Sequence, residues 1–328
     1  MRILLNGSIA RTGEDHLRSH FGDAATVQLT GPDDGPDDGA RKFGEAEILV
    51  TVGYDAETPP APNLRLIHVP ASGLDEIDFQ AVPDGVPVCN AFEHDSGIAE
   101  HVLAAILQFA VDLPGRDRRF RSGSWADSPR MGAAGRPELT GQTLGCIGYG
   151  SIARAVATRA RAFDMRIAAA TRAPRSLDPE PDVLVGFDRI GEVLEQADFL
   201  VIACPLTPAT TGLIGPGEID RMKRSLVLIN VARGPIVDEQ ALFEALREER
   251  IAGAAIDVWY RYPSPGEPEP RPSSLPFHEL DNVIMTPHCS GWTAELMRRR
   301  FAVIIDNIER LRAGRPLRNQ VWPKAGAL

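Results

Sequence analysis

An arginine and a histidine, each placed after an apolar run, are the side chains of this 328-residue sequence best suited to chemistry on a small anion. Arg233 ends the run "LINVAR", and His288 follows "NVIMTP" and stands among small residues. A guanidinium can clamp a carboxylate with two parallel hydrogen bonds and can polarise a neighbouring carbonyl group. An imidazole titrates near neutral pH, which suits a general acid or base. The pair predicts a site for a small carboxylate if folding brings both residues together.

A glycine-rich turn lies upstream, in "LGCIGYGSIARAVATRARAF". Gly148, Gly150 and Ala153 form the pattern G-x-G-x-x-A, directly after an apolar strand pattern and directly before a helical one. In such a turn the first glycine permits a tight bend, the second leaves room for a pyrophosphate, and the small third residue lets helix and strand pack closely. The phosphates would lie at the N-terminus of the helix. The turn therefore predicts a dinucleotide site.

The end of the next predicted strand, "MRIAAATRAPR", indicates which dinucleotide fits. Proteins that bind NAD place an acidic residue here for the ribose hydroxyls, whereas a basic residue tolerates a 2′-phosphate. The sequence offers Thr171, Arg172 and Arg175, and no carboxylate. We therefore expect NADP(H) to be favoured, with NAD(H) as the alternative.

The elements that would position these residues alternate along the chain. Short apolar runs such as "RILLN", "LRLIHV", "DFLVIAC" and "LVLINVA" are separated by segments of helical period, and this alternation is typical of βαβ units with parallel sheets. A chain of this length also exceeds what one hydrophobic core usually serves. The helix predicted over residues 96–113 separates two groups of strands, so we place the first domain boundary near its start. The last helix, over 294–314, is expected to return to the first domain.

Composition argues against several classes of protein. The net charge of −10 disfavours a general affinity for nucleic acid or anionic membranes. No apolar run approaches the roughly 18 residues of a membrane span, and the start "MRILLNG" lacks the features of a signal peptide. The cysteines are far apart and form no CxxC pair, which favours buried thiols in a reducing compartment over disulfides or a metal site. They are Cys89, Cys146, Cys204 and Cys289. The protein is expected in the cytoplasm, with no metal.

Several blocks of the sequence resemble the D-isomer-specific 2-hydroxyacid dehydrogenases, which include glyoxylate and hydroxypyruvate reductases, phosphoglycerate dehydrogenase and formate dehydrogenase. In the order of that family they are "AEHVLAAIL", "ELTGQTLGCIGYGSIA", "CPLTPATTGLI", "LINVARGPIVDEQAL", "GAAIDV" and "NVIMTPHCSGWT". The resemblance implies an α/β fold with two doubly wound parallel-sheet domains. One is a flavodoxin-like substrate-binding domain over 1–96 and 294–328, and the other is a dinucleotide-binding Rossmann domain over 97–293. It also implies hydride transfer between NAD(P) and C2 of a small 2-hydroxy or 2-oxo acid.

The resemblance further assigns roles to single residues. Arg233 would bind and polarise the substrate, His288 would exchange a proton with its oxygen, and Asp257 would support this pair near the nicotinamide. The loop "VPASGLDEID" would join Arg233 and His288 in holding the substrate carboxylate, through backbone N–H groups of Ala71, Ser72 and Gly73. Thr171 and Arg172 at the strand end are candidate cofactor contacts, and the matched blocks imply the others, namely Gly148, Tyr149, Gly150, Ser151, Ile152, Cys204, Pro205, Thr210, Val231, Ala232, Asp257, His288 and Gly291.

One position departs from the family pattern. Most members carry a glutamate that pairs with the histidine and raises its pKa, and here Tyr262 takes that place. A phenol is neutral at physiological pH, so it can hydrogen-bond His288 but cannot stabilise an imidazolium as a carboxylate would. Three interpretations stay open. Tyr262 is a catalytic residue that orients His288; or the protein oxidises formate or another small anion that needs no general base; or another group substitutes, with Glu93, His94 and Asp95 as candidates.

Three further expectations concern partners and loops. The resemblance implies a homodimer that pairs through the cofactor domain, using the helix around Ala99 and the arm "RDRRFRSGSW". The proline-rich run over 263–276 predicts a semi-rigid flap over the site or a dimer contact. The alternative from another functional class is a dinucleotide-sensing binding protein that keeps the fold and lacks turnover.

Overall fold

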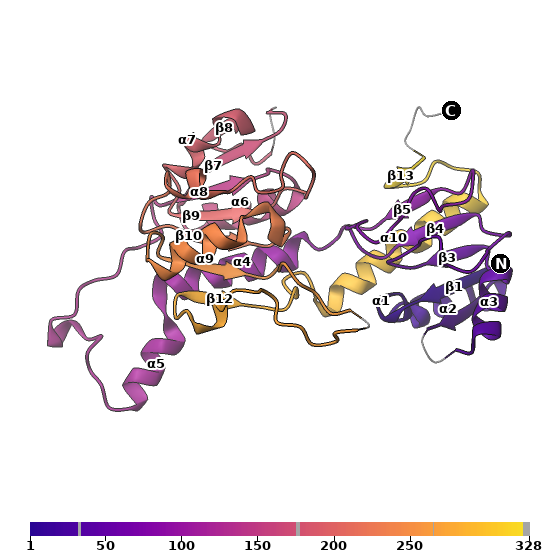
Figure 1. Ribbon diagram of the computed structural model, residues 1–328, viewed down its shortest axis with the longest axis horizontal. Coiled ribbons are helices and arrows are strands. Elements are labelled where there is room, and N and C mark those ends of the chain that lie inside the picture. Colours follow the sequence, from indigo (N-terminus) through magenta and orange to yellow (C-terminus); the bar gives the residue numbers. More distant parts are fainter. Residues whose placement is uncertain (32–33, 175–177, 265, 324–328) are drawn as a thin grey trace. The chain divides into compact units, whose positions relative to one another are not determined.

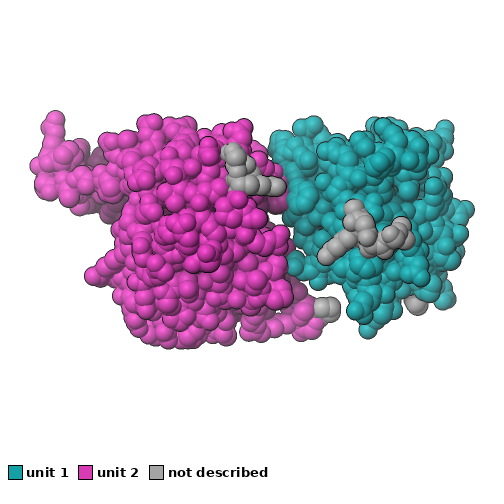
Figure 2. Space-filling model, turned by 90° about the horizontal axis from the view of Figure 1, so that it is seen from above, with its two compact units in different colours: residues 1–93, 293–328 teal, residues 94–292 magenta. Residues whose placement is uncertain are grey.

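The computed structural model describes residues 1–31, 34–174, 178–264 and 266–323. The chain divides into two compact units, one formed by residues 1–93 and 293–328 and the other by residues 94–292 (Figure 2). Each unit has its own sheet and its own apolar core. Arg175, one of the basic residues expected near the cofactor ribose, lies outside the described residues.

The first unit contains a six-stranded sheet in the order β13-β5-β4-β3-β1-β2 (Figure 1). Its strands are β1 (Arg2–Asn6), β2 (Thr26–Thr30), β3 (Ile48–Val50), β4 (Leu66–Val69), β5 (Val88–Asn90) and β13 (Gln320–Trp322). All neighbours are parallel except β13 and β5. The sequence pattern does not predict strands β2 and β13, because "TVQLT" is half polar and "QVW" is too short for a periodic signal.

Helices cover this sheet on both faces. They are α1 (Ser8–Arg11), α2 (Glu14–Phe21), α3 (Pro36–Glu45) and α10 (Ala294–Arg312). Side chains alternate along β1, so that Ile3 and Leu5 pack with α2 and α10 while Leu4 packs with the opposite core. Thr293 caps α10 by accepting a hydrogen bond from the Leu296 N–H. The last helix belongs to the first unit because its apolar face completes that core.

The second unit contains a seven-stranded, fully parallel sheet in the order β12-β11-β10-β9-β6-β7-β8. Its strands are β6 (Thr143–Ile147), β7 (Arg166–Thr171), β8 (Val183–Gly186), β9 (Phe199–Ile202), β10 (Val227–Asn230), β11 (Gly253–Ile256) and β12 (Val283–Met285). The strand order reverses between β6 and β9. At such a switch point, ligands bind beside the carboxyl ends of the strands.

Two layers of helices enclose the second sheet (Figure 1). One face packs against α4 (Asp95–Val111) and α6 (Ser151–Arg161), and the other packs against α7 (Gly191–Leu194), α8 (Pro216–Ile219) and α9 (Glu239–Arg247). The predicted fold class, two doubly wound α/β domains, is therefore confirmed.

Helix α5 (Leu113–Arg121) and the arm that follows extend away from this sheet (Figure 1). Asp112, between α4 and α5, has a left-handed φ of 51°, and its side chain caps α5. Helix α5 and this arm expose large apolar side chains, namely Leu113, Phe120, Trp125 and Met131. Among the described residues no single helix is long and apolar enough to span a bilayer, and α4 with α5 reaches that length only as a pair bent by 46°.

Candidate active site

Three adjacent parallel strands bring the predicted catalytic residues to one edge of the second sheet. Strands β10, β11 and β12 lie side by side and end in register. Arg233 follows β10 by three residues, Asp257 directly follows β11, and His288 follows β12 by three residues. Since all strands are parallel, these ends form the carboxyl edge of the sheet, where ligands of such folds bind.

Asp257 holds the loop that carries His288. Its carboxylate accepts hydrogen bonds from the Thr286 hydroxyl at 2.6 Å and from the N–H groups of Cys289 and Ser290, each at 2.9 Å. Its carbonyl accepts the N–H of His288 at 2.8 Å. These bonds stabilise the left-handed backbone of His288, whose φ of 55° is costly for a residue other than glycine. Asp257 is therefore a positioning residue for the histidine.

The same contacts keep Asp257 ionised. The side chain is buried, and burial acts to raise its pKa. Hydrogen bonds from Ser290, Thr286 and Cys289 outweigh burial and hold the pKa below its ordinary value of 3.8. A fixed negative charge therefore lies behind the histidine loop at neutral pH.

Tyr262 contacts His288 through its phenol. The hydroxyl oxygen lies 2.9 Å from Nδ1 of the imidazole, and the rings meet edge to face with centroids 5.6 Å apart. The same oxygen accepts the N–H of Trp259 at 3.2 Å. A hydroxyl can donate to a neutral imidazole and accept from an imidazolium, so Tyr262 fits either state of the histidine. This is the contact that the first of the three interpretations requires.

Trp259, three residues after β11, makes contacts with several parts of this sheet edge. The indole N–H donates to the carbonyl of Thr286 at 2.9 Å, and the backbone N–H reaches Tyr262. A Cβ on Gly234 would clash with the carbonyl oxygen of Trp259, so the turn after Arg233 packs directly on this residue. The indole also packs edge to face on the buried ring of Phe277. The sequence signal is a large aromatic residue placed just after a buried strand.

The backbone around Arg233 is fixed by Asn230, a buried residue at the end of β10. The Asn230 amide donates to the carbonyl of Arg233 at 3.1 Å and accepts the N–H of Ala232 at 3.1 Å. The guanidinium of Arg233 donates to the carbonyl of Ala232 at 2.7 Å. Both the arginine and the histidine loops are thus held by buried polar side chains of the same sheet edge.

The residues of the glycine turn fit a dinucleotide. A Cβ on Gly148, whose φ is 88°, would lie 2.7 Å from the backbone of Cys204, so only glycine lets the loops after β6 and β9 meet at the switch point. A Cβ on Gly150 would meet nothing within 4 Å, and Gly150 begins α6 without a side-chain cap. The first N–H groups of α6 therefore adjoin open space, which suits a pyrophosphate. Ala153 is fully buried, so the helix packs closely on the sheet.

Two residues predicted to contact the cofactor use their side chains elsewhere. The buried hydroxyl of Tyr149 donates to the carbonyl of Pro179 at 2.8 Å, and burial raises its pKa to about 12. The hydroxyl of Thr210 accepts the Thr207 N–H at 2.8 Å and donates to the Pro205 carbonyl at 2.7 Å. These side chains shape the loops after β6 and β9.

The other predicted cofactor contacts also follow strands at this edge. Cys204, Val231 and Ala232 are buried, so they offer mainly backbone to a ligand, whereas Arg172 is exposed at the end of β7. The remaining members of the predicted set are Ser151, Ile152, Thr171, Pro205 and Gly291. Of the four cysteines, three are buried as expected, but the expectation is wrong for Cys289, which is exposed.

The predicted substrate loop lies in the first unit, after β4. The carbonyl of Ala71 accepts the N–H of Ala91 at 3.1 Å, and the carbonyl of Ser72 accepts from the Asn90 amide at 2.9 Å. Within the described residues, the backbone N–H groups of Ser72 and Gly73 donate no hydrogen bond. Both are available to an anion.

Residues 103–290 match the family model described as D-isomer specific 2-hydroxyacid dehydrogenase, NAD binding domain. The chain belongs to this family. The resemblance seen in the sequence is thereby confirmed, and family members are NAD(P)-dependent dehydrogenases and reductases.

Individual relatives are similar over most of this chain. A D-3-phosphoglycerate dehydrogenase of Archaeoglobus fulgidus is 35% identical over 85% of this chain and 51% of its own length, so the chain spans about half of that relative. A glyoxylate reductase of Pyrococcus furiosus is 35% identical over 84% of this chain and 82% of its own. A solved D-isomer specific 2-hydroxyacid dehydrogenase of Xanthobacter autotrophicus, in complex with NADPH and MES, is 27% identical, with a TM-score of 0.77 over 98% of this chain and 97% of that one.

The proline-rich segment is fastened to the second unit at both ends. The N–H groups of Tyr260 and Arg261 donate to the carbonyl of Pro272 at 3.3 and 3.0 Å, and the Tyr260 hydroxyl donates to the Val237 carbonyl at 2.9 Å. Phe277, just after the segment, is fully buried. The segment is thus anchored at its two ends, and its role as a flap or as a dimer contact stays a prediction.

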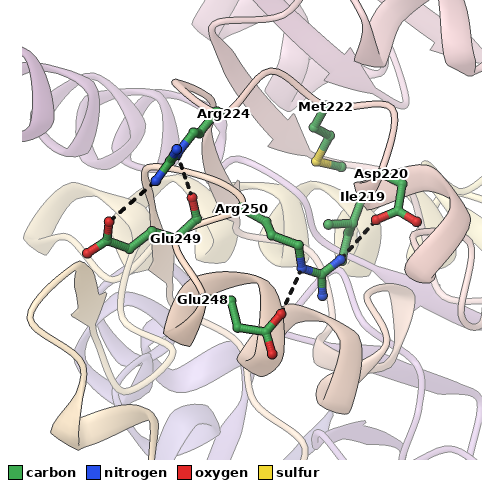
Figure 3. A pocket seen from close by; sticks show the side chains of 7 residues that line it. All are labelled: Ile219, Asp220, Met222, Arg224, Glu248, Glu249 and Arg250. Atoms are coloured by element: carbon green, nitrogen blue, oxygen red, sulfur yellow. Dashed lines mark hydrogen bonds and ion pairs between the residues drawn. The ribbon is translucent and has the colours of Figure 1, made fainter.

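A pocket elsewhere in the second unit lacks the features of this site (Figure 3). Its lining residues are Ile219, Asp220, Met222, Arg224, Glu248, Glu249 and Arg250. They precede β10 and β11, so the pocket lies at the amino edge of the sheet, opposite the ligand edge. Its charged groups pair with one another: Arg250 with Asp220 and Glu248, and Arg224 with Glu249. We assign it no role.

Proposed function

We propose that the protein is an NADP(H)-dependent oxidoreductase that interconverts a small 2-oxo acid and the corresponding 2-hydroxy acid. The observation that carries the proposal is the Tyr262–His288 contact, held by Asp257 at the sheet edge that also bears Arg233. Similarity to a glyoxylate reductase over most of both chains supports a substrate of that size.

Each residue then has a defined task. The nicotinamide, when bound, supplies or accepts the hydride. Arg233 binds the substrate carboxylate and polarises the C2 carbonyl. Because Nδ1 of His288 faces Tyr262, Nε2 is the nitrogen that gives a proton to the C2 oxygen during reduction and takes it back during oxidation. Asp257 keeps the imidazole in place.

The preference for NADP(H) belongs to this proposal. It is supported by exposed Arg172 at the end of β7 and by the absence of a carboxylate in "TRAPR". A related structure contains NADPH. We also propose a homodimer, supported by the apolar side chains that α5 and its arm expose, since exposed apolar clusters mark association sites. The cytoplasmic location stays a prediction.

The test is a substrate panel with purified protein. NADPH or NADH is mixed with glyoxylate, hydroxypyruvate, pyruvate or phenylpyruvate, and the absorbance of the nicotinamide is followed. We expect turnover with at least one 2-oxo acid and a higher kcat/KM with NADPH than with NADH. Tight cofactor binding without turnover on any substrate in either direction would instead indicate a dinucleotide-sensing protein.

One alternative reaction has an observation in its favour. The partner of His288 is a neutral phenol, and oxidation of formate releases no hydroxyl proton, so it needs no strong base at this position. The same assay, run with NADP⁺ or NAD⁺ and formate or phosphite, tests this alternative. Turnover there, with none on the 2-oxo acids, would replace the proposed reaction.

A further inference from the structure

The first unit contains a buried arginine that is not among the residues predicted for the active site. Arg300 lies on α10 and is only 8% exposed. In the part of the chain that the structure describes, no carboxylate lies within ion-pair distance of its guanidinium; Glu93 acts on it only at longer range. Burying a charge without a close partner costs free energy, so the position calls for an explanation.

The guanidinium is bound to the backbone that carries the substrate loop. Its Nε donates to the carbonyl of Phe92 at 2.9 Å, and its Nη1 donates to the carbonyl of Pro70 at 3.1 Å. Pro70 directly precedes Ala71, Ser72 and Gly73. A guanidinium has five N–H donors, and no other hydrogen bond of Arg300 is made within the described residues. Part of the group is therefore left for water or a ligand.

The loop itself has unused hydrogen-bond donors. Its carbonyls are engaged by Ala91 and Asn90, while the N–H groups of Ser72 and Gly73 have no acceptor among the described residues. Burial lowers the pKa of Arg300 to about 10, so the group is still charged at neutral pH. A positive charge is thus bound to the carbonyl of Pro70, two residues before the first of two unused N–H donors of the same unit.

We propose that Arg300 supplies the positive charge of a carboxylate-binding site whose hydrogen-bond donors are the N–H groups of Ser72 and Gly73. The bound carboxylate compensates the buried charge, which explains why a charged residue is kept there. By holding the Pro70 carbonyl, Arg300 also fixes the loop. The inference rests on the proposed function only in naming the ligand as the carboxylate of a 2-oxo acid. Arg300 is then a binding residue of the first unit, separate from Arg233.

The test is calorimetric titration of the holoprotein, saturated with NADPH, with oxamate, an unreactive analogue of 2-oxo acids. Arg300→Gln removes the charge, Arg300→Lys keeps it without the planar fork, and Arg298→Gln removes the same charge from an exposed position on the same helix. We expect Arg300→Gln to weaken oxamate binding by at least about tenfold, or about 1.4 kcal/mol. Arg300→Lys keeps a positive charge and should weaken oxamate binding less than Arg300→Gln does, by about threefold, and Arg298→Gln should leave it unchanged.

Two outcomes would overturn the proposal: oxamate affinity unaffected by Arg300→Gln, or lost in Arg300→Lys. The second result would mean that the arginine serves only to hold the two carbonyls. The lysine variant decides this point even if the glutamine variant does not fold, and the Kd for NADPH reports on the second unit. Turnover is measured separately. Arg300-dependent oxamate binding without turnover would refute the proposed function and leave this inference standing.

Discussion

The phenol oxygen of Tyr262 lies 2.9 Å from Nδ1 of His288, so the imidazole is oriented by a neutral group. The hydroxyl can donate or accept, and it therefore satisfies the neutral and the protonated ring alike. It adds no negative charge, however, and gives the imidazolium less stabilisation than a carboxylate would. The consequence should appear in the pH range over which the protein reduces a 2-oxo acid, because reduction needs a proton on the histidine.

Tyr262→Glu tests this relationship. A carboxylate at this position favours the imidazolium and should raise the pKa of His288, so reduction should persist to higher pH than in the unchanged protein. The measurement is kcat/KM for the best 2-oxo acid as a function of pH. Superimposable profiles for the two proteins would show that the charge of this neighbour does not control the histidine.

Tyr262→Phe and His288→Ala separate orientation from proton transfer. The phenylalanine variant keeps the ring and loses one hydrogen bond, so kcat should fall moderately, by about tenfold. Loss of the imidazole should lower kcat by about a thousandfold, as expected for a general acid. If the two losses were equal, the phenol itself would be a principal catalytic group.

Gly148 and Gly150 should respond in opposite ways to a single methyl group. Gly148→Ala places Cβ 2.7 Å from the Cys204 backbone at a φ of 88° and should lower the free energy of unfolding by more than about 1 kcal/mol. Gly150→Ala meets no protein atom within 4 Å and has a φ of −85°, so stability should hold. Its methyl group would instead occupy the space left for the pyrophosphate.

Thermal unfolding and the Kd for NADPH check both variants. We expect Gly150→Ala to raise the Kd at least about tenfold, or about 1.4 kcal/mol, with an unchanged Tm. Unaltered NADPH affinity in that variant would remove the cofactor from this turn. Gly148→Ala serves as the matched control, because it adds the same group two residues away and should affect Tm first.

Asp257→Asn removes the negative charge beside the histidine loop and weakens the hydrogen bonds that hold this loop. The amide cannot accept all the hydrogen bonds that the carboxylate receives from Thr286, Cys289 and Ser290, so the free energy of unfolding should fall by about 2 kcal/mol. Since the folded pKa lies below 3.8, the contribution of the carboxylate is present above about pH 4 and is lost as pH falls through the folded pKa. Urea unfolding at neutral pH measures the loss of stability, and kcat measures the effect on the position of His288. An unchanged kcat would exclude Asp257 from positioning His288.

The sequence alone predicts those site residues that come just after a strand of the parallel sheet. Arg233, His288 and Gly148 each follow a strand in a parallel sheet, so the carboxyl edge gathers them wherever the strands pair. The tasks of Asp257 and Arg300 could not be predicted in this way. Asp257 binds N–H groups more than thirty residues away, and Arg300 donates to a carbonyl 230 residues distant. Such contacts depend on backbone groups, which are the same in every residue and leave no pattern in the sequence.

The first unit should be sensitive to mild acid because of one buried histidine. His68 on β4 is fully buried, its Nε2 accepts from the amide of Asn307, and its Nδ1 faces the carbonyl of Val69. Burial lowers its pKa from the ordinary 6.5 to about 4. Below pH 6.5 the histidine binds a proton in the unfolded chain but not in the folded one. The free energy of unfolding therefore has its full value above pH 6.5 and falls as the pH decreases toward 4.

Across that window the loss should approach about 3 kcal/mol. His68→Gln removes the titrating group and keeps a side chain that can accept from Asn307, so its free energy of unfolding should vary less between about pH 7 and about pH 4.5. Urea unfolding at both pH values measures the difference. Equal pH dependence in the two proteins would mean that His68 binds its proton as easily in the fold as in the unfolded chain. That result would contradict its burial between β4 and α10.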